Sequence, residues 1–185
     1  MKELSLHLLD IAQNSVSARA RAICICVRES TSADRLVLAV QDDGAGMDAE
    51  TVRQVVDPFY TSRTTRNVGL GIPLLKAAAE ACEGFLTIQS QPGVGTRLEV
   101  EFQRSHIDRM PLGDITETFL SLVIACPEIN WRLVYQFDQN LFEFDDNEFK
   151  LALEGIPLTE PSVQAVLREY LHEGIAQLQP ESETY

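Results

Sequence analysis

The stretch HLLDIAQNSVSA, residues 7–18, combines an apolar helix pattern with a stripe of polar side chains. Its leucines, isoleucine, alanines and valine have the density of a buried helix. His7, Asp10 and Asn14 are nonetheless three and four residues apart, which places them on one helix face. A buried carboxylate without a partner is costly. The stripe is therefore predicted to face either water or a binding partner for these polar groups.

The pattern around this helix predicts a mixed sheet in the first hundred residues. Helices are expected at 4–19, 49–57 and 72–84, and strands at 22–29, 35–42, 85–90 and 96–103. This order of elements favours an α+β fold, with a mixed β-sheet and helices on one face.

Three glycine-bearing motifs follow the helix in order. Asp43-Gly44-Ala45-Gly46 comes directly after a strand, Gly69-Leu70-Gly71 opens the long helix, and Gly93-Val94-Gly95-Thr96 joins the last two strands. Each motif alone is most simply explained as a turn, a loop or a hairpin. Their joint occurrence in this order and spacing is not easily explained as an accident.

Together the motifs resemble those of the gyrase, heat-shock chaperone, histidine kinase and mismatch-repair ATPases (GHKL). HLLDIAQNSVSA resembles the N box of that family and DDGAG (42–46) its DxGxG box. DPFYTSR (57–63) is similar to the F box of histidine kinases, VGLGIPLLK (68–76) to their GxGL-type box, and PGVGTRLEVEF (92–102) to their GxGT strand. The resemblance covers about residues 4–103 and implies a Bergerat fold, a two-layer α/β sandwich.

The resemblance implies that the motifs at 43–46 and 93–96 bind adenine. Asp43, held as a carboxylate, would accept a hydrogen bond from the exocyclic amino group and so discriminate adenine from guanine. Gly44 and Gly46 would let the backbone approach the ring. Thr96 would add a hydroxyl group to this polar network.

The same resemblance implies a phosphate and metal site. Amides freed by Gly69 and Gly71 at a helix start would meet phosphate oxygens. Arg63, Arg66 and Lys76 would supply positive charge.

The polar stripe then gains a role. By resemblance, Asn14 binds Mg²⁺ and Asp10, one turn earlier, acts as a base on a water or hydroxyl. Asp10 stands where glutamate is commoner, so its reach is shorter. His7 is expected to be a polar lining or surface residue rather than a catalytic group.

Residues 105–185 differ in composition from residues 1–104. Of the net charge of −13, about −2 lies before Ser105 and −11 after Arg104. We therefore divide the chain into an ATP-binding domain, 1–104, and an acidic α+β region, 105–185, of unknown role. Helices are expected at 114–126, 148–154 and 161–173, with a hairpin at 130–137 and 141–144. This region could pack on the sheet as a second domain or bind a partner.

The segment SHIDRMPL, residues 105–112, resembles the phosphoacceptor box of sensor kinases. His106 would be the phosphoacceptor. The box normally precedes the ATP domain, however, and Ile107 stands where an acidic residue is expected. We favour a connector whose polar residues cap the following helix.

The leading hypothesis is a Mg²⁺-dependent ATP-binding protein that transfers phosphate to, or hydrolyses ATP for, a separate protein partner. The alternative is an ATP-gated protein-binding module with little turnover, and a third possibility is a scaffold that binds no nucleotide. Acidic charge argues against nucleic acid, and no apolar run approaches the ~20 residues of a membrane span. Four cysteines without a CxxC pair, and no signal peptide, lead us to expect a cytoplasmic protein.

Overall fold

The computed structural model describes residues 3–57 and 71–178. The predicted helices and strands form within one or two residues of their expected bounds in most cases. The helices are α1 Leu4–Ser17, α2 Ala49–Val55, α3 Gly71–Ala81, α4 Ile115–Ala125, α5 Asp146–Ala152 and α6 Pro161–Ala176. The strands are β1 Ala22–Ser30, β2 Arg35–Asp42, β3 Phe85–Gln91, β4 Gly95–Gln103, β5 Asn130–Phe137 and β6 Asn140–Asp145.

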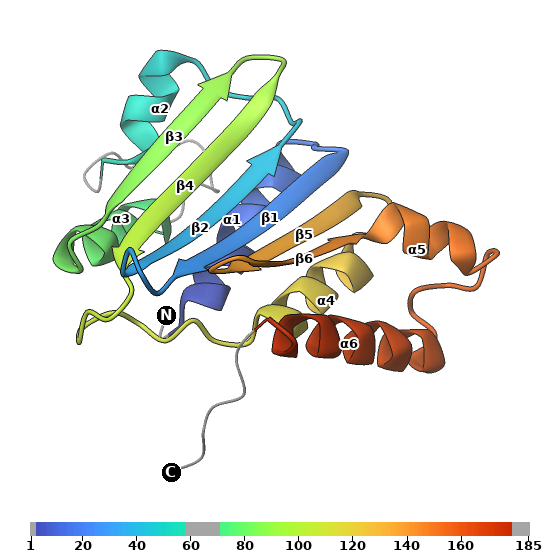
Figure 1. The fold of residues 1–185 in the computed structure, drawn as a ribbon. Coiled ribbons are helices and arrows are strands. Elements are labelled where there is room, and N and C mark those ends of the chain that lie inside the picture. Colours follow the sequence, from blue (N-terminus) through green and yellow to red (C-terminus); the bar gives the residue numbers. More distant parts are fainter. Residues whose placement is uncertain (1–2, 58–70, 179–185) are drawn as a thin grey trace, which may run out of the picture.

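The strands form one six-stranded sheet in the order β3-β4-β2-β1-β5-β6 (Figure 1). All neighbours are antiparallel except β1 and β5, which pair in parallel from Ala22↔Asn130 to Glu29↔Phe137. Strands from both sides of the composition change at Arg104 therefore belong to the same sheet.

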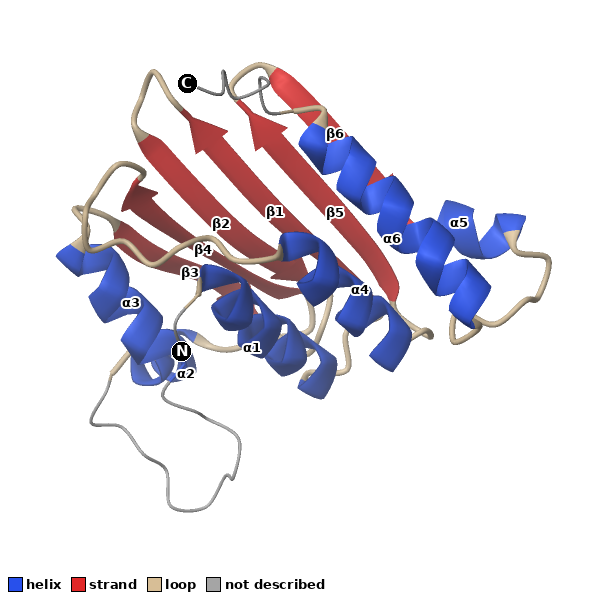
Figure 2. Cartoon of the chain, turned by 90° about the horizontal axis from the view of Figure 1, so that it is seen from below, coloured by secondary structure: helices blue, strands red, loops and turns tan. Residues whose placement is uncertain are grey.

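Helices α1, α3, α4 and α6 lie across one face of this sheet (Figure 2). The strand sequences alternate accordingly. In β1, Ile23, Ile25 and Val27 are buried beneath the helices, whereas Cys24 and Cys26 lie on the opposite face. We call that opposite face the open face. The predicted α+β sandwich with helices on one face is confirmed.

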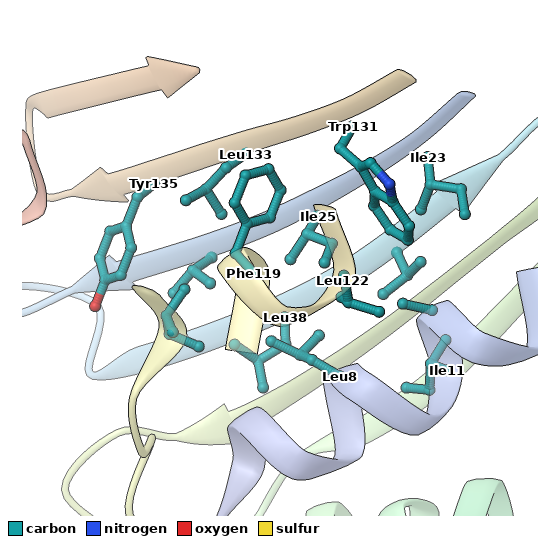
Figure 3. Packing of buried hydrophobic residues seen from close by; sticks show 14 of the residues in the cluster. Leu8, Ile11, Ile23, Ile25, Leu38, Phe119, Leu122, Trp131, Leu133 and Tyr135 are labelled. Carbon is teal, nitrogen blue, oxygen red and sulfur yellow. The ribbon is translucent and has the colours of Figure 1, made fainter. Parts of the chain in front are cut away.

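A single hydrophobic core lies between the sheet and the helices (Figure 3). Leu8 and Ile11 of α1 pack in the same cluster as Phe119 of α4 and Trp131 and Leu133 of β5. Trp131 and Leu133 are both fully buried. The core thus joins residues before and after Arg104.

The connector between β4 and α4 supports the start of α1. Glu3, at the N-cap of α1, makes no capping hydrogen bond with its side chain. Instead, the amides of Leu4 and Ser5 donate to the carbonyls of Pro111 and Leu112, at 3.0 and 2.8 Å. These bonds satisfy two of the backbone donors that a helix start leaves without an internal partner. Within residues 3–57 and 71–178, no helix is long and apolar enough to cross a membrane.

Candidate nucleotide site

A cavity of about 360 Å³ opens where α1, the C-terminal end of β2 and the β3–β4 hairpin meet the start of α3. Its volume falls in the range of small-molecule sites, roughly 300–1,000 Å³. The wall is mainly apolar, from Ile11, Val40, Val55, Ile72, Ile88 and Leu98, with polar groups from Asn14, Ser15, Asp42 and Thr96.

Asp42 provides the carboxylate of this cavity. It follows Leu36, Leu38 and Val40 at every second position of β2, so its side chain turns to the helix-covered face. Ser15 Oγ donates to one carboxylate oxygen at 2.5 Å, and the Gly44 amide donates to the other at 2.9 Å. The Thr96 amide adds a longer bond of 3.3 Å. Three donors from three segments thus fix the carboxylate against the cavity.

Asp43 is placed differently from its neighbour and is not among the lining residues. Its carboxylate accepts hydrogen bonds from the amides of Arg21 and Ala22, at 2.7 and 2.9 Å. Burial opposes its ionisation, but these backbone bonds outweigh burial and lower the pKa of Asp43. Asp43 therefore anchors the start of β1, and of the two neighbouring aspartates only Asp42 lines the cavity.

A hydroxyl pair fixes the loop after β2 to the β3–β4 hairpin. Ser90 Oγ accepts from the Met47 amide at 2.7 Å and lies 2.8 Å from Thr96 Oγ1. It also donates to the Gly95 carbonyl at 3.1 Å. Thr96 is thus part of a polar network at the cavity, and its partner Ser90 was not foreseen.

Two glycines are required by close backbone contacts beside the cavity. Gly46 has φ +67°, and a Cβ there would lie 2.0 Å from the Gln91 carbonyl oxygen. Gly95 has φ +129°, and its Cβ would lie 2.0 Å from the Asp42 carbonyl oxygen. Both glycines therefore let the loop and the hairpin approach each other. Gly44 contributes differently, because its amide donates a hydrogen bond to Asp42.

The polar stripe of α1 divides among three environments. Asn14 is exposed and lines the cavity. Asp10 lies one turn away beside Gly71, where an added Cβ would be 3.4 Å from its Oδ2, and it is not a lining residue. His7 is buried, and its Nδ1 has no hydrogen-bond partner in the described part of the chain. Burial lowers the pKa of His7, so the imidazole is held neutral.

The predicted phosphate-binding residues are only partly placed. Arg63, Arg66 and Gly69 lie outside the described residues. Gly71 begins α3, next to the lining residue Ile72. Lys76 forms an ion pair of 3.2 Å with Glu80 one turn along α3 and does not line the cavity.

His106 lies in the connector, beyond the far end of β4. Its Nδ1 accepts from the Asp108 amide at 3.2 Å, in a turn rather than a helix. Thr96 and Gln103 are seven residues apart along β4, which at about 3.4 Å per residue separates the cavity from the connector by about 24 Å. Asp114, not His106, caps α4 by accepting from the Glu117 amide at 2.9 Å.

Alternation in β2 is the sequence signal that could have identified Asp42. Leu36, Leu38 and Val40 mark the buried face, and the next residue on that face is Asp42. In the box D-x-G-x-G, the same residue stands two positions before the first glycine, Gly44. The sequence could also have drawn attention to Ser15, because it directly follows Asn14 in α1.

Comparison with known proteins identifies the family of this chain. Residues 2–106 match the family described as histidine kinase-, DNA gyrase B- and HSP90-like ATPase. The match covers more than half of the 185 residues, so the chain belongs to this family. The resemblance drawn from the motifs is confirmed.

Curated relatives are mostly sensor kinases. Sporulation kinase C of Bacillus subtilis is 28% identical over 53% of this chain and 23% of its own length. Sensor protein kinase FleS of Pseudomonas aeruginosa is 38% identical over 48% of this chain and 22% of its own. The chain therefore spans less than a quarter of these relatives.

The ADP-complexed ATPase domain of Aquifex aeolicus MutL has a similar fold, with a TM-score of 0.51 at 14% identity. The likeness covers 92% of this chain and 70% of that domain. It extends well past residue 106, so the acidic region takes part in the shared architecture.

Proposed function

We propose that this protein binds ATP in the cavity, with Asp42 recognising the adenine. The observation that carries the proposal is the fixed Asp42 carboxylate. A carboxylate has about four acceptor positions, and three are used by Ser15, Gly44 and Thr96. The exocyclic amino group of adenine can fill the remaining position. Guanine presents a carbonyl oxygen at the equivalent place, which the carboxylate would repel.

Apolar side chains support the same assignment. Ile11, Val40 and Leu98 line the same cavity as the Asp42 carboxylate, together with Ile88 and Ile72. A flat base buries both faces against such a surface while its polar edge reaches Asp42. Family membership, and the ADP bound by the MutL ATPase domain, favour an adenine nucleotide as the occupant.

Mg²⁺ fits the open side of the cavity. Asn14 offers an amide oxygen there, and oxygen is the ligand that Mg²⁺ prefers. When bound with the nucleotide, the ion would neutralise charge on the phosphates. The residues described here contain no cluster of three or more acidic, histidine or cysteine side chains for a metal. This agrees with an ion held by one or two protein groups and by the phosphates themselves.

The proposed reaction is phosphotransfer to, or ATP hydrolysis directed at, a separate protein partner. Asp10 is one turn from Asn14 and lies against the start of α3. At this position it would accept a proton from the attacking hydroxyl or water. Its absence from the cavity lining favours a second candidate, an ATP-gated binding module with little turnover. Single-turnover phosphate release with Asp10→Asn separates the two. A transition-state role predicts unchanged ATP affinity with slower release, whereas a wild type without release supports the binding module.

Neighbouring aspartates provide the test of ATP recognition. Asp42→Asn presents a donor to the adenine amine, and calorimetry with Mg²⁺ should show a loss of about 1–3 kcal/mol, or roughly 5- to 150-fold in Kd. Asp43→Asn is the matched control, since its amide oxygen can still accept from Arg21 and Ala22. Equal ATP affinity in wild type and Asp42→Asn would contradict the assignment. Asn14→Ala should lower affinity only when Mg²⁺ is present.

A further inference from the structure

Two cysteines face each other on the open face, away from the nucleotide cavity. Cys24 and Cys26 are alternate residues of β1, and their sulfur atoms lie 3.6 Å apart. Both side chains are half-buried, and neither belongs to the core. In Figure 1, α1 lies behind β1, so this face of the sheet is not covered by the described helices. Small or neutral neighbours, Ala39 and Gln41 of β2, lie directly beside the two cysteines.

Charged residues surround the pair on the neighbouring strands. Arg28 is the next residue of β1 on this face, and Arg132 of β5 is directly opposite Cys24. Beyond β2 and β5, strand β4 contributes Arg97 and Glu99, and β6 contributes Glu143 and Asp145. Glu99 pairs with Arg28 at 3.0 Å and with Arg97, and Asp145 pairs with Arg132 at 3.5 Å.

This environment separates the two thiols chemically. A hydrogen bond from Cys24, helped by Arg97, Arg28 and Arg132, lowers the pKa of Cys26 to about 7 even though burial opposes it. The same hydrogen bond, together with burial, raises the pKa of Cys24. The two thiols titrate as a pair, so the first proton leaves the pair more readily than it leaves a free thiol, and the thiol that remains can donate a hydrogen bond to the thiolate.

We propose that Cys24 and Cys26 form a thiol–disulfide exchange site, in which Cys26 attacks low-molecular-weight disulfides and Cys24 holds its thiolate by a hydrogen bond. In the reaction, the Cys26 thiolate attacks one sulfur of R–S–S–R. A bond forms between Cys26 Sγ and that sulfur, the R–S–S–R bond breaks, and the second sulfur leaves as a thiolate, so no further oxidant is needed. The product is a mixed disulfide on the open face.

The geometry also limits the alternatives. Residues i and i+2 of a strand have Cα atoms about 6.7 Å apart, at the upper edge of the separation that a disulfide can span. The mixed disulfide on Cys26, rather than a Cys24–Cys26 bridge, is therefore the expected product. Three nearby guanidinium groups and the lack of a third ligand in the described part of the chain disfavour a metal ion.

The other two cysteines serve as internal controls. Cys82 is 2% exposed, and burial raises its pKa. Burial likewise raises the pKa of Cys126. Reagents that reach thiols only through unfolding would show no preference for Cys26 over these two.

The test treats the native protein with 2-hydroxyethyl disulfide, a neutral probe, and locates adducts by peptide mass spectrometry. At pH 7, a thiol with a pKa near 7 has about 50-fold more thiolate than one near 9, but lower nucleophilicity leaves a net gain of about five-fold. We expect Cys26 to react about five-fold faster than in the denatured chain, with an adduct of one mercaptoethanol. Cys82 and Cys126 should react far more slowly.

Variants of Cys24, the proposed hydrogen-bond donor to Cys26, complete the test. Cys24→Ala should shift the pH midpoint of Cys26 labelling upward, and Cys24→Ser, which keeps a hydroxyl donor, should recover part of that shift. Circular dichroism checks that both variants fold. The proposal is overturned if Cys26 reacts no faster than the denatured thiol, if Cys82 or Cys126 reacts first, or if neither variant moves the midpoint.

Discussion

Residues 4–103 and residues 115–178 contribute to one sheet but carry very different sequence signals. The first region holds every motif that indicates a ligand and is nearly neutral, whereas the second is acidic and holds none. Yet β5 and β6 extend the sheet, and α4 packs beside α1 in the common core. The motifs thus indicate where a ligand is expected, while the extent of the folding unit is set by buried apolar surface.

Truncating the buried indole of β5 tests this contrast most severely. Trp131 is fully buried, so Trp131→Ala should cost about 3–5 kcal/mol of unfolding free energy. Urea unfolding followed by circular dichroism measures the loss. Val134→Ala, on the open face of the same strand, is the control and should cost much less. A second test uses the wild type. Fluorescence of the single tryptophan should change together with circular dichroism, because residues 4–103 and 115–178 unfold at once. Two separate transitions would show independent domains.

The glycine hairpin near the cavity offers a second comparison within the first region. Gly95→Ala would press a methyl group onto the Asp42 carbonyl, so it should lower stability by well over ~1 kcal/mol and weaken ATP binding. Gly93→Ala shares the positive φ but meets nothing within 4 Å, and it should cost only about 1 kcal/mol. Thermal unfolding measures the stability of the two variants and calorimetry their ATP affinity. The comparison separates the effect of the close backbone contact from that of a positive φ. Equal losses of stability in the two variants would contradict the role assigned to the close approach of Gly95 to the Asp42 carbonyl.

Acidification should weaken the protein through the buried imidazole of α1. The folded state lowers the pKa of His7 below its usual 6.5, so the unfolded chain binds more protons once the pH falls below about 6.5. Stability from this group is present above pH 6.5 and is lost as the pH falls, by up to ~1.4 kcal/mol per pH unit. Urea midpoints between pH 7.5 and 5.5 should fall more in the wild type than in His7→Gln. Parallel curves would show that His7 is not held neutral.

The smallest effect is expected on the open face. Arg28 and Glu99 pair at 3.0 Å with 44% and 25% of their side chains exposed. Such exposed pairs contribute roughly 0–1 kcal/mol. Arg28→Gln should therefore change the urea midpoint little at either low or high salt. A large loss would mean that the open face stabilises the fold as strongly as the core does.

Local patterns were sufficient to predict the elements of this fold. The strand bounds 35–42 agree with β2, and the bounds 22–29 agree with β1 to within one residue. The order of strands was not predictable in the same way. Pairing of β1 with β5 depends on contacts between residues more than a hundred positions apart, which no local period reports.

At the cavity, the sequence pattern led to Asp43, whereas the structure places the neighbouring Asp42 in the cavity wall. Asp42 and Asp43 have the same side chain, and only the two-residue period of the strand separates their directions. Hydroxyl partners such as Ser90 were beyond prediction for another reason. Their role follows from the β3–β4 pairing, which brings Ser90 opposite Thr96.

The parallel pairing of β1 with β5 has a consequence for the order in which the chain is made. Until residue 130 and those after it leave the ribosome, β1 is an edge strand that presents unpaired backbone groups along the apolar run AICICV (22–27). Such an edge is a template for association with other chains. In a chain that stops at Arg104, this edge would have no β5 to pair with. By pairing β5 with β1, the acidic region turns this edge strand into an inner strand of the sheet.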